Sequence, residues 1–307
     1  MSNIVRIEYG DYIADIDLNN GVKCIGLYNI VIRATILKNK PYNGNHYLCG
    51  APLLFPANRI ENGSFLFEGR EYEFEVNEKN TNCHIHGVLH DAPFELVSRD
   101  KNKVVCAYTI HSRKGFEHDV TVEITYELSN EGLLTKLKLV NNSPYSLPAI
   151  LGYHTTFNIA FTAYTSKQSV KVKAGIEGEI VRDKNFLPTG EILEVDEISK
   201  AFENGEFVPY KNPISRHCKA TSNVMTITNT ERKFRIVYEV DEKFKYRLIY
   251  NGDGEDFICL EPQTNMVNAP NLKGYENEID VILPNTSKEY VTKIKIEQEN
   301  YYENHKA

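Results

Sequence analysis

The sequence predicts an all-β protein with a single domain. Apolar and polar residues alternate at period two in many short segments, which is typical of strands with one buried face. Almost no segment has helical periodicity, and neither a repeat of fixed period nor a Pro/Ser/Gly-rich linker divides the 307 residues. Because 41% of the residues are hydrophobic, the chain can bury a sizeable core. We expect one domain over residues 1–300 and a frayed tail over 301–307.

The expected strands are separated by turn residues along the chain. The clearest hairpin runs from Asp119 to Val140, where two alternating segments flank a turn at Asn130-Glu131-Gly132. Residues 176–215 are rich in glycine, glutamate and asparagine, so we expect mostly loop there, with a turn at 188–190 and one helical turn within 202–207. Further strands are expected over 4–9, 12–18, 22–27, 65–67, 72–76, 104–110, 224–228, 234–240, 246–250, 257–260 and 290–297.

The charge and apolar patterns exclude several classes of partner. The net charge is −7 and no Lys/Arg cluster is present, so we expect neither nucleic acid nor a membrane as a partner. No apolar segment approaches the roughly 20 residues that span a bilayer, and the N-terminal residues lack the basic and apolar blocks of a secretory signal. The six cysteines are scattered without a C-x-x-C pair, which is typical of reduced, buried thiols in a cytoplasmic protein.

A first polar segment contains Asn58 and Arg59, and it is followed by His84, His86 and Gly87. Residues two apart on a strand face the same way, so both histidines would line one cavity. Gly87 would let the backbone turn or a ligand approach closely. Arg59 would offer a fixed fork of donors to a sugar hydroxyl or a carboxylate. Alternatively, His84 is a surface histidine of a strand and Arg59 belongs to a surface ion pair.

Two further segments carry His154 and Glu261. An imidazole transfers protons near pH 7, although a lone histidine is more often a satisfied core residue. Glu261 comes at the end of an apolar strand, where a carboxylate is costly to bury unless it is paired or functional. Pro262 would fix the exit from that strand and hold the carboxylate in place.

Together these residues indicate proton transfer without a nucleophile. The sequence contains no Gly-x-Ser-x-Gly elbow, no phosphate-binding glycine loop and no dinucleotide fingerprint. The chemistry that fits is the removal of one proton from a hydroxyl-rich substrate and the addition of another. A carboxylate base and a protonated histidine acid predict a bell-shaped rate profile, which a flat profile from about pH 5 to 8 would contradict. We expect no cofactor and no metal.

The motifs resemble those of the aldose 1-epimerase family, the galactose mutarotase-like proteins. Four motifs occur in the family's order and approximate spacing: Asn-Arg-Ile-x-x-Gly at 58–63, His-Gly at 86–87, Gly-x-His-x-x-Phe-Asn at 152–158 and Leu-Glu-Pro at 260–262. The resemblance covers residues 10 to 295. It implies a large antiparallel β-supersandwich with an open carbohydrate-binding cleft, in which the α and β anomers of a free sugar interconvert.

The resemblance also implies roles for individual residues. Glu261 would take the proton from the anomeric hydroxyl, His154 would protonate the ring oxygen, and His86 would orient and polarise the substrate as a third catalytic residue. The ring would open, the carbonyl carbon would rotate, and the ring would close on its other face. The substrate-binding residues would be Asn58, Arg59, His84, Arg216, Gln263 and Asn271.

Three departures from the family's pattern favour a substrate other than galactose. Mutarotases of the family usually carry an aspartate and then a histidine before residue 220, but this chain reads Ser215-Arg216-His217. Residues 88–95 lack the double glycine and tryptophan of galactose mutarotases, and Thr156 replaces the usual tyrosine before Phe157. The chain is therefore closer to an uncharacterised branch of the family. Arg216 would meet a sugar phosphate or a sugar acid, unless it is a surface residue.

Two alternatives belong to other functional classes. His84 and His86, with Asp91 or Glu95 downstream, resemble the ligand set of cupin metal enzymes, which chelator treatment would reveal. A non-catalytic sugar-binding protein would keep the cleft, bind sugar saturably and exchange anomers no faster than buffer. The expected partner is a small sugar substrate, and the protein is expected to be a monomer or a homodimer.

Overall fold

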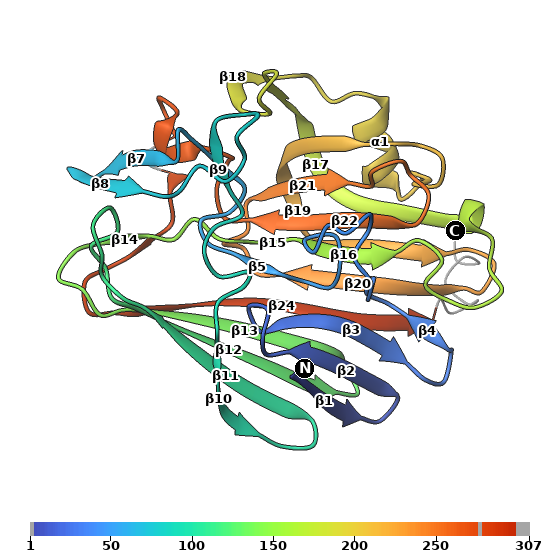
Figure 1. Cartoon of the computed structure of the whole chain (residues 1–307). Helices are drawn as coiled ribbons and strands as arrows, with labels where there is room; N and C mark the ends of the chain where they lie inside the picture. The colour runs from blue at the N-terminus through green and yellow to red at the C-terminus, as the bar shows by residue number, and fades with distance from the viewer. Residues whose placement is uncertain (1–2, 276–277, 299–307) are drawn as a thin grey trace.

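The structure, a computed structural model, describes residues 3–275 and 278–298 and is built mainly from antiparallel strands (Figure 1). The predicted all-β class is therefore confirmed. The predicted tail over 301–307 lies outside the described residues. Within the described ranges, no helix is long and apolar enough to cross a membrane. All six cysteines are buried and free, as expected from their spacing.

A small sheet and a large sheet account for most of the chain. The small sheet has the order β1 (Ile4–Tyr9), β2 (Tyr12–Asp17), β3 (Lys23–Asn29) and β4 (Ala34–Thr35). The large sheet has 14 strands and begins with β10 (Glu95–Arg99), β11 (Lys103–Ile110), β12 (Val120–Ser129), β13 (Gly132–Asn141), β24 (Ser287–Gln298), β20 (Phe234–Val240) and β19 (Ser215–Asn229). One continuous core of buried apolar side chains includes residues of both sheets.

The large sheet continues with the strands that carry the candidate site. After β19 come β21 (Tyr246–Tyr250), β22 (Phe257–Gln263), β15 (Gly152–Tyr153) and β5 (Leu53–Leu54). Three strands branch from this path: β16 (Thr155–Asn158) pairs with β22, and β17 (Val170–Arg182) pairs with β18 (Pro188–Ile192) and β19. This half of the sheet therefore collects chain segments that are far apart in sequence.

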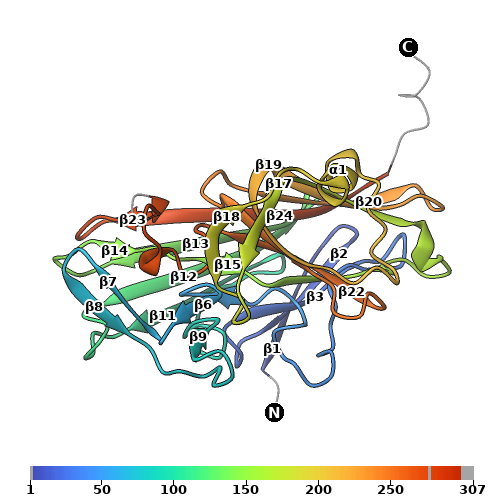
Figure 2. The same cartoon turned by 90° about the horizontal axis from the view of Figure 1, so that it is seen from above.

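The remaining elements are short. The pairs are β6 (Arg59–Glu61) with β9 (Cys83–Ile85), β7 (Ser64–Phe67) with β8 (Arg70–Glu73), and β14 (Leu147–Pro148) with β23 (Val281–Ile282). The helical elements are η1 (Lys167–Ser169), α1 (Glu197–Asn204) and η2 (Ala269–Asn271). The β7–β8 hairpin lies at one end of the molecule, and α1 lies on the side opposite β1 (Figures 1 and 2).

The best-defined sequence pattern gave the most accurate prediction. The register of β12 and β13 runs without a break from Val120 opposite Asn141 to Ser129 opposite Gly132. Burial alternates strictly along β12, with buried and half-exposed residues in turn. One face packs into the core while the other meets solvent, which is the arrangement that period-two alternation predicts.

The prediction of a mostly loop segment over 176–215 is wrong. Residues Val170–Arg182 form the 13-residue strand β17, and the expected turn at 188–190 lies within β18. The glycines that suggested loop serve close packing of backbones: a Cβ on Gly178 would lie 1.6 Å from the carbonyl oxygen of Leu193. The register of β17 against β19 also shifts twice, so bulges interrupt the alternation that marks a strand.

The expected helical turn within 202–207 is the end of a longer helix. Asp196 caps the N-terminus of α1 by accepting a hydrogen bond from the backbone N–H of Ser199. Gly205 ends the helix with a left-handed conformation, φ 70°. Both capping residues are typical of helix ends, so the local sequence explains where this two-turn helix begins and ends.

Candidate functional site

Strand β22 carries the central carboxylate of the site. Its residues Cys259, Glu261 and Gln263 are spaced by two, so their side chains leave the same face, and all three are buried. The strand continues through Pro262, so the prediction that the proline marks its exit is wrong. The pairing of β22 with β15 and β16 is interrupted between Leu260 and Gln263. Pro262 lies in this interruption, where its missing backbone N–H is tolerated.

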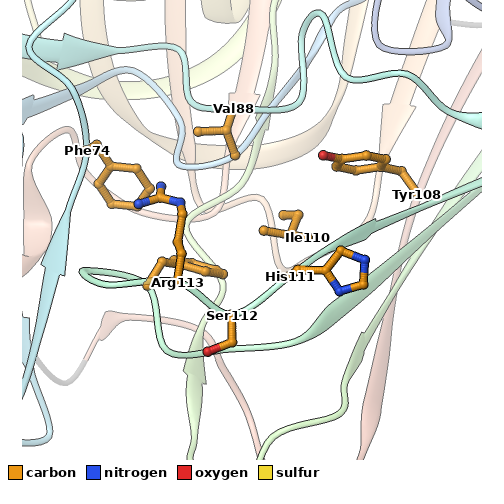
Figure 3. Close-up of a pocket in the computed structure, with 8 residues that line it drawn as sticks. Phe74, Val88, Tyr108, Ile110, His111, Ser112 and Arg113 are labelled. Atoms are coloured by element: carbon orange, nitrogen blue, oxygen red, sulfur yellow. The ribbon is translucent and has the colours of Figure 1, made fainter.

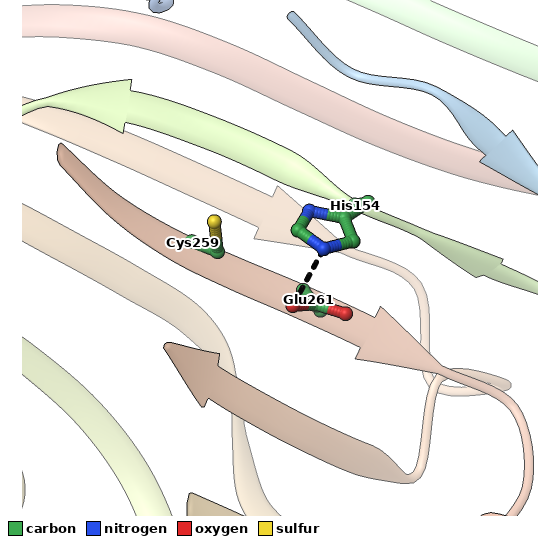
Figure 4. Close-up of side chains that lie close together, drawn as sticks. All are labelled: His154, Cys259 and Glu261. Carbon is green, nitrogen blue, oxygen red and sulfur yellow. Dashed lines mark ion pairs between the residues drawn. The ribbon is translucent and has the colours of Figure 1, made fainter. Parts of the chain in front are cut away.

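His154 occupies the interruption between β15 and β16. Its backbone N–H donates to the carbonyl oxygen of Pro52 at 3.0 Å, which fixes the residue across from β22. The Nε2 atom of His154 lies 3.4 Å from Oε1 of Glu261 (Figure 4). The two side chains are only 7% and 1% exposed. The structure thus brings together the predicted acid and the predicted base in a site shielded from solvent.

His86 joins this pair from a different part of the chain. Its ring lies edge-on to that of His154, with 5.3 Å between the ring centroids, and Tyr47 packs 4.4 Å from it on another side. His86 has a left-handed backbone, φ 66°, and its N–H donates to the carbonyl oxygen of Asn58. Next to it, Gly87 approaches the backbone of Phe55, where a Cβ would lie 2.2 Å from the carbonyl group.

Burial favours the neutral form of each ionisable group in the cluster. It raises the pKa of Glu261 well above its usual value, and the charges of Arg59 and Arg182 oppose that shift. Burial, together with a smaller effect of the charge of Lys23, lowers the pKa of His154 to about 4. In His86, burial and then the charge of His154 hold the pKa well below 6.5. The His154–Glu261 pair is therefore suited to hold one proton, which either residue can carry.

Several buried polar atoms around this pair have no hydrogen-bond partner within the described ranges. Most buried polar atoms in folded proteins are paired, so a group of exceptions indicates a binding site for a polar molecule. The exceptions here are both carboxylate oxygens of Glu261, both amide atoms of Gln263, both ring nitrogens of His217, and Nδ1 of His86 and of His154. A hydroxyl-rich ligand offers both donors and acceptors to such a set.

Arg59 and Asn58 support the cluster in different ways. The guanidinium of Arg59 binds both carboxylate oxygens of Glu78, at 2.6 and 2.8 Å, and lies 4.8 Å from the ring of Phe186. This ion pair is largely buried rather than on the surface, since the side chain of Arg59 is 15% exposed. Asn58 is buried, and its Oδ1 accepts from the N–H of Arg59. Asn58 therefore positions its neighbour and His86 through hydrogen bonds to their backbones.

Two predicted residues have described contacts only outside the cluster. Strand β9 ends at Ile85, so the two-residue spacing does not bring His84 beside His86. Instead, Nδ1 of His84 bonds the carbonyl oxygen of Glu75 and its ring stacks 5.0 Å from Phe74. Asn271 is exposed and donates to the backbone of Ser64 and to the side chain of Asn268.

Arg216 is a buried structural residue, not a surface one. Its guanidinium binds Asp196 at 2.5 and 2.7 Å, Ser199 at 3.0 Å and Glu179 at 3.0 Å. These contacts join α1 to β17 and β19. The Arg216 guanidinium holds the pKa of Asp196 well below its usual range. Its charge is therefore already compensated, and the proposed contact with an anionic sugar loses its support.

The neighbouring histidine was overlooked in the sequence. His217 lies opposite Leu248 on β21, and Leu248 lies opposite Glu261 on β22, so the three side chains leave the same face of the sheet. His217 is fully buried, and burial together with the charge of Arg182 lowers its pKa to about 3. Arg182 itself donates to the carbonyl oxygen of Ser215. Because side chains alternate along a strand, only one of the adjacent residues Arg216 and His217 can face Glu261, and this signal could have indicated His217.

Other residues of the cluster had no recognisable sequence signal. Tyr47 comes from a loop, and its ring contacts His86, His90 and, at 6.5 Å, His154. Lys23 is buried, and its ammonium group donates to the carbonyl oxygen of His46 at 3.0 Å. Both reach the site only because the fold returns distant segments to β22.

A separate cavity of about 350 Å³ contains none of the predicted site residues (Figure 3). Its lining is Phe74, Val88, Tyr108, Ile110, His111, Ser112, Arg113 and Phe116. It has a histidine and an arginine but no carboxylate, and Arg113 donates to the backbone carbonyl of Glu73. The chemistry of proton transfer therefore favours the Glu261 cluster over this cavity.

Solved structures of other proteins share this fold. A galactose mutarotase-like protein from Clostridium acetobutylicum superposes with a TM-score of 0.89 over 96% of this chain and 95% of its own, at 28% sequence identity. A putative aldose 1-epimerase from Escherichia coli gives a TM-score of 0.82 over 97% of this chain and all of its own, at 18% identity. The predicted large antiparallel β fold of the galactose mutarotase type is therefore confirmed.

Sequence relatives include both uncharacterised proteins and named mutarotases. The Escherichia coli protein YihR, described as uncharacterised, is 22% identical over 82% of this chain and 80% of its own length. Pig galactose mutarotase is 24% identical over 51% of this chain and 45% of its own. The sequence profile of the family described as aldose 1-epimerase matches residues 34–295. This match spans most of the chain, and the chain therefore belongs to the aldose 1-epimerase family.

Proposed function

We propose that this protein is a mutarotase, which interconverts the α and β anomers of a free aldose by opening and closing the sugar ring. The observation that supports this most strongly is the buried pair of Glu261 and His154, 3.4 Å apart. Nδ1 of His154 and both oxygens of Glu261 have no hydrogen-bond partner among the described residues. Ring opening needs a base and an acid at once, and this pair offers both.

In the proposed reaction, Glu261 accepts the proton of the anomeric hydroxyl while His154 donates a proton to the ring oxygen. The bond between the anomeric carbon and the ring oxygen breaks, its electrons go to the ring oxygen, and the anomeric C–O becomes a carbonyl. Rotation of that carbonyl lets the ring oxygen attack the opposite face, and both protons return. The pair holds one proton at the start and at the end, so no nucleophile or redox group is required.

Nearby positive charges and the hydroxyls of a bound sugar would oppose the effect of burial on Glu261. The charges of Arg59 and Arg182 lower the pKa of Glu261, which partly offsets the effect of burial. Sugar hydroxyls would add hydrogen bonds to the carboxylate and the imidazolium, and hydrogen bonds to a charged form favour it. His86 packs edge-on to His154 and would orient and polarise the substrate.

A neutral aldose is the substrate class with the most support. Arg216, which suggested a phosphorylated or acidic sugar, is compensated by Asp196 and Glu179. The cupin-like alternative requires His84 and His86 to face one metal, but β9 ends at Ile85 and His86 has a left-handed backbone, so the two side chains do not share a strand face. Among the described residues, the ligand atoms that lie close enough together to hold a metal do not include those of His84. A non-catalytic sugar-binding protein of the same fold stays as the second candidate, because the family's aspartate before residue 220 is missing.

Anomer exchange measured by NMR tests the proposal. The substrates would be a panel of free aldoses together with 6-phosphorylated and acidic sugars. We expect exchange faster than buffer for at least one sugar, loss of this activity in Glu261→Gln, and full activity in Glu203→Gln, which changes an exposed glutamate of α1. Saturable binding of a sugar without faster exchange would instead identify a binding protein.

A further inference from the structure

A cysteine completes a group of three metal-ligating side chains around the proton-transfer pair. The thiol of Cys259, the imidazole of His154 and the carboxylate of Glu261 each offer one ligand atom, and these atoms lie within 4.8 Å of one another. Figure 4 shows the three side chains converging from β22 and from the segment between β15 and β16. Thiolate, imidazole and carboxylate are the three ligand types that Zn²⁺ uses in proteins.

The sheet holds these ligands in place. Cys259 and Glu261 are two apart on β22, and His154 is held against the same strand by its backbone hydrogen bond to Pro52. Both oxygens of Glu261 are buried and have no hydrogen-bond partner among the described residues, and the thiol of Cys259 contacts the hydroxyl of Thr156 at 3.4 Å. The carboxylate is thus available to a cation without breaking an existing hydrogen bond.

We propose that Cys259, His154 and Glu261 form a binding site for Zn²⁺, and that zinc bound there inhibits the protein. Zinc bonds of about 2.0–2.3 Å in a tetrahedral site bring ligand atoms to roughly 3.3–3.8 Å from one another. Nε2 of His154 and Oε1 of Glu261 already lie 3.4 Å apart, and the sulfur of Cys259 lies within 4.8 Å of the ligand atoms of both. The fourth position stays open for water or a sugar hydroxyl.

Charge explains why a dication suits this site. A buried thiolate and a buried carboxylate are each costly alone, whereas Zn²⁺ with both of them forms a neutral group. The metal would occupy the lone pairs with which Glu261 and His154 move protons. Bound zinc is therefore an inhibitor and not a cofactor of the proposed reaction.

Zinc binding can be measured without reference to activity. We expect the intact protein to withdraw one equivalent of Zn²⁺ from a chromophoric chelator. Cys259→Ser should bind Zn²⁺ on the order of 100-fold more weakly, because it loses the soft ligand. Cys106→Ser is the matched control, since it changes another fully buried cysteine on β11 and should bind normally. Equal affinity in Cys259→Ser and the intact protein would overturn the assignment.

Cobalt gives a second readout that needs no variant. Co²⁺ added to the intact protein should produce the near-ultraviolet absorption of a thiolate bound to cobalt, and Zn²⁺ should abolish it. Absence of this band would contradict the site even where Cys259→Ser fails to fold. We also expect Zn²⁺ to inhibit anomer exchange and EDTA to reverse this inhibition. This expectation rests on the proposed function. If no sugar is turned over, the chelator and cobalt measurements still decide whether the metal site exists.

Discussion

His217 and Glu261 occupy equivalent positions on two strands of the large sheet, because each lies opposite Leu248 of the intervening strand β21. Neighbouring strands are about 4.8 Å apart, so roughly 10 Å separates the two backbones. The side chain of Leu248 lies between them on the same face, so a sugar ring that contacts both would lie over Leu248. Among the described residues, both ring nitrogens of His217 and both oxygens of Glu261 lack a hydrogen-bond partner. We therefore predict that His217 binds the substrate in the proposed reaction.

Substitution of His217 should therefore weaken substrate binding. In His217→Leu, we expect KM for the best sugar to rise about tenfold, because a hydrogen-bonding group is replaced by an apolar one. The value of kcat should change less, since Glu261 and His154 keep their contact. Anomer exchange measured over a range of sugar concentrations separates the two effects. A loss confined to kcat would contradict the binding role.

The same variant should change how stability depends on pH. The pKa of His217 is about 3 in the folded protein, against about 6.5 in the unfolded chain. The unfolded state therefore binds the proton first, and stability is lost as pH falls from 6.5 toward 3. At pH 5 this amounts to about 2 kcal/mol. We expect the drop in unfolding free energy from pH 7 to pH 5, measured with urea, to be smaller by that amount in His217→Leu.

The acid limb of the rate profile should lie near pH 4 and should respond to Lys23. A second proton on the His154–Glu261 pair removes the base, and the pKa of His154 is about 4. The charge of Lys23 contributes to lowering that pKa. In Lys23→Met the acid limb should therefore move to higher pH. Lys40→Met, which changes an exposed lysine, should leave the limb in place.

The acid limb must be recorded on folded protein. Near-ultraviolet circular dichroism at each pH would establish this. The basic limb should follow the raised pKa of Glu261, where the pair loses its only proton. The acid side of the predicted bell therefore lies below about pH 5. A rate that does not fall at either end would exclude Glu261 and His154 as the two proton carriers.

Replacement of Arg216 should affect stability and leave catalysis unchanged. In Arg216→Met, the carboxylates of Glu179 and Asp196 lose their shared partner at the junction of α1 and β17. Asp196 is 44% exposed, so water compensates part of this loss, and we expect a destabilisation of about 2 kcal/mol. Urea unfolding measures it. A higher KM for phosphorylated or acidic sugars in this variant would instead restore Arg216 as a substrate-binding residue.

The sequence predicted strands most accurately where one face of the strand is exposed to solvent. The β12–β13 hairpin was predicted in register because its burial alternates. Strand β19 gave no such signal near the site, since Arg216, His217 and Cys218 are all buried. Without polar and apolar alternation, nothing in the composition tells which of two adjacent residues faces the site. Strand β17 was not predicted for a related reason. Each register shift at a bulge moves the buried residues to the opposite face of the strand, which interrupts the period-two alternation in the sequence.

The chemical residues were easier to identify than their surroundings. Glu261 was recognisable because few structural reasons place a carboxylate in an apolar strand, whereas the role of His154 came from the resemblance to the family. Tyr47 and Lys23 belong to segments far from either residue in sequence, and only the packed fold brings them close. Long-range contacts of this kind leave no local pattern in a single sequence.

Gly87 offers a test of how the backbone positions His86. A Cβ at residue 87 would lie 2.2 Å from the carbonyl group of Phe55, and φ is 73°. Gly87→Ala should therefore displace His86 from the ring of His154 and destabilise the protein by about 3 kcal/mol or more. Gly44→Ala is the matched control: its φ is 75°, but no atom lies within 4 Å of the added Cβ.

The two glycine variants separate backbone strain from the close contact at the site. Gly44→Ala carries only the cost of a left-handed alanine, about 1–2 kcal/mol, and should keep full anomer exchange. Gly87→Ala should lose at least about tenfold in exchange rate, because a displacement of about 1 Å at a catalytic group has effects of that size or larger. Thermal unfolding and NMR exchange on both proteins provide the comparison. Equal exchange rates in the two variants would mean that the close approach to Phe55 does not position His86 for catalysis.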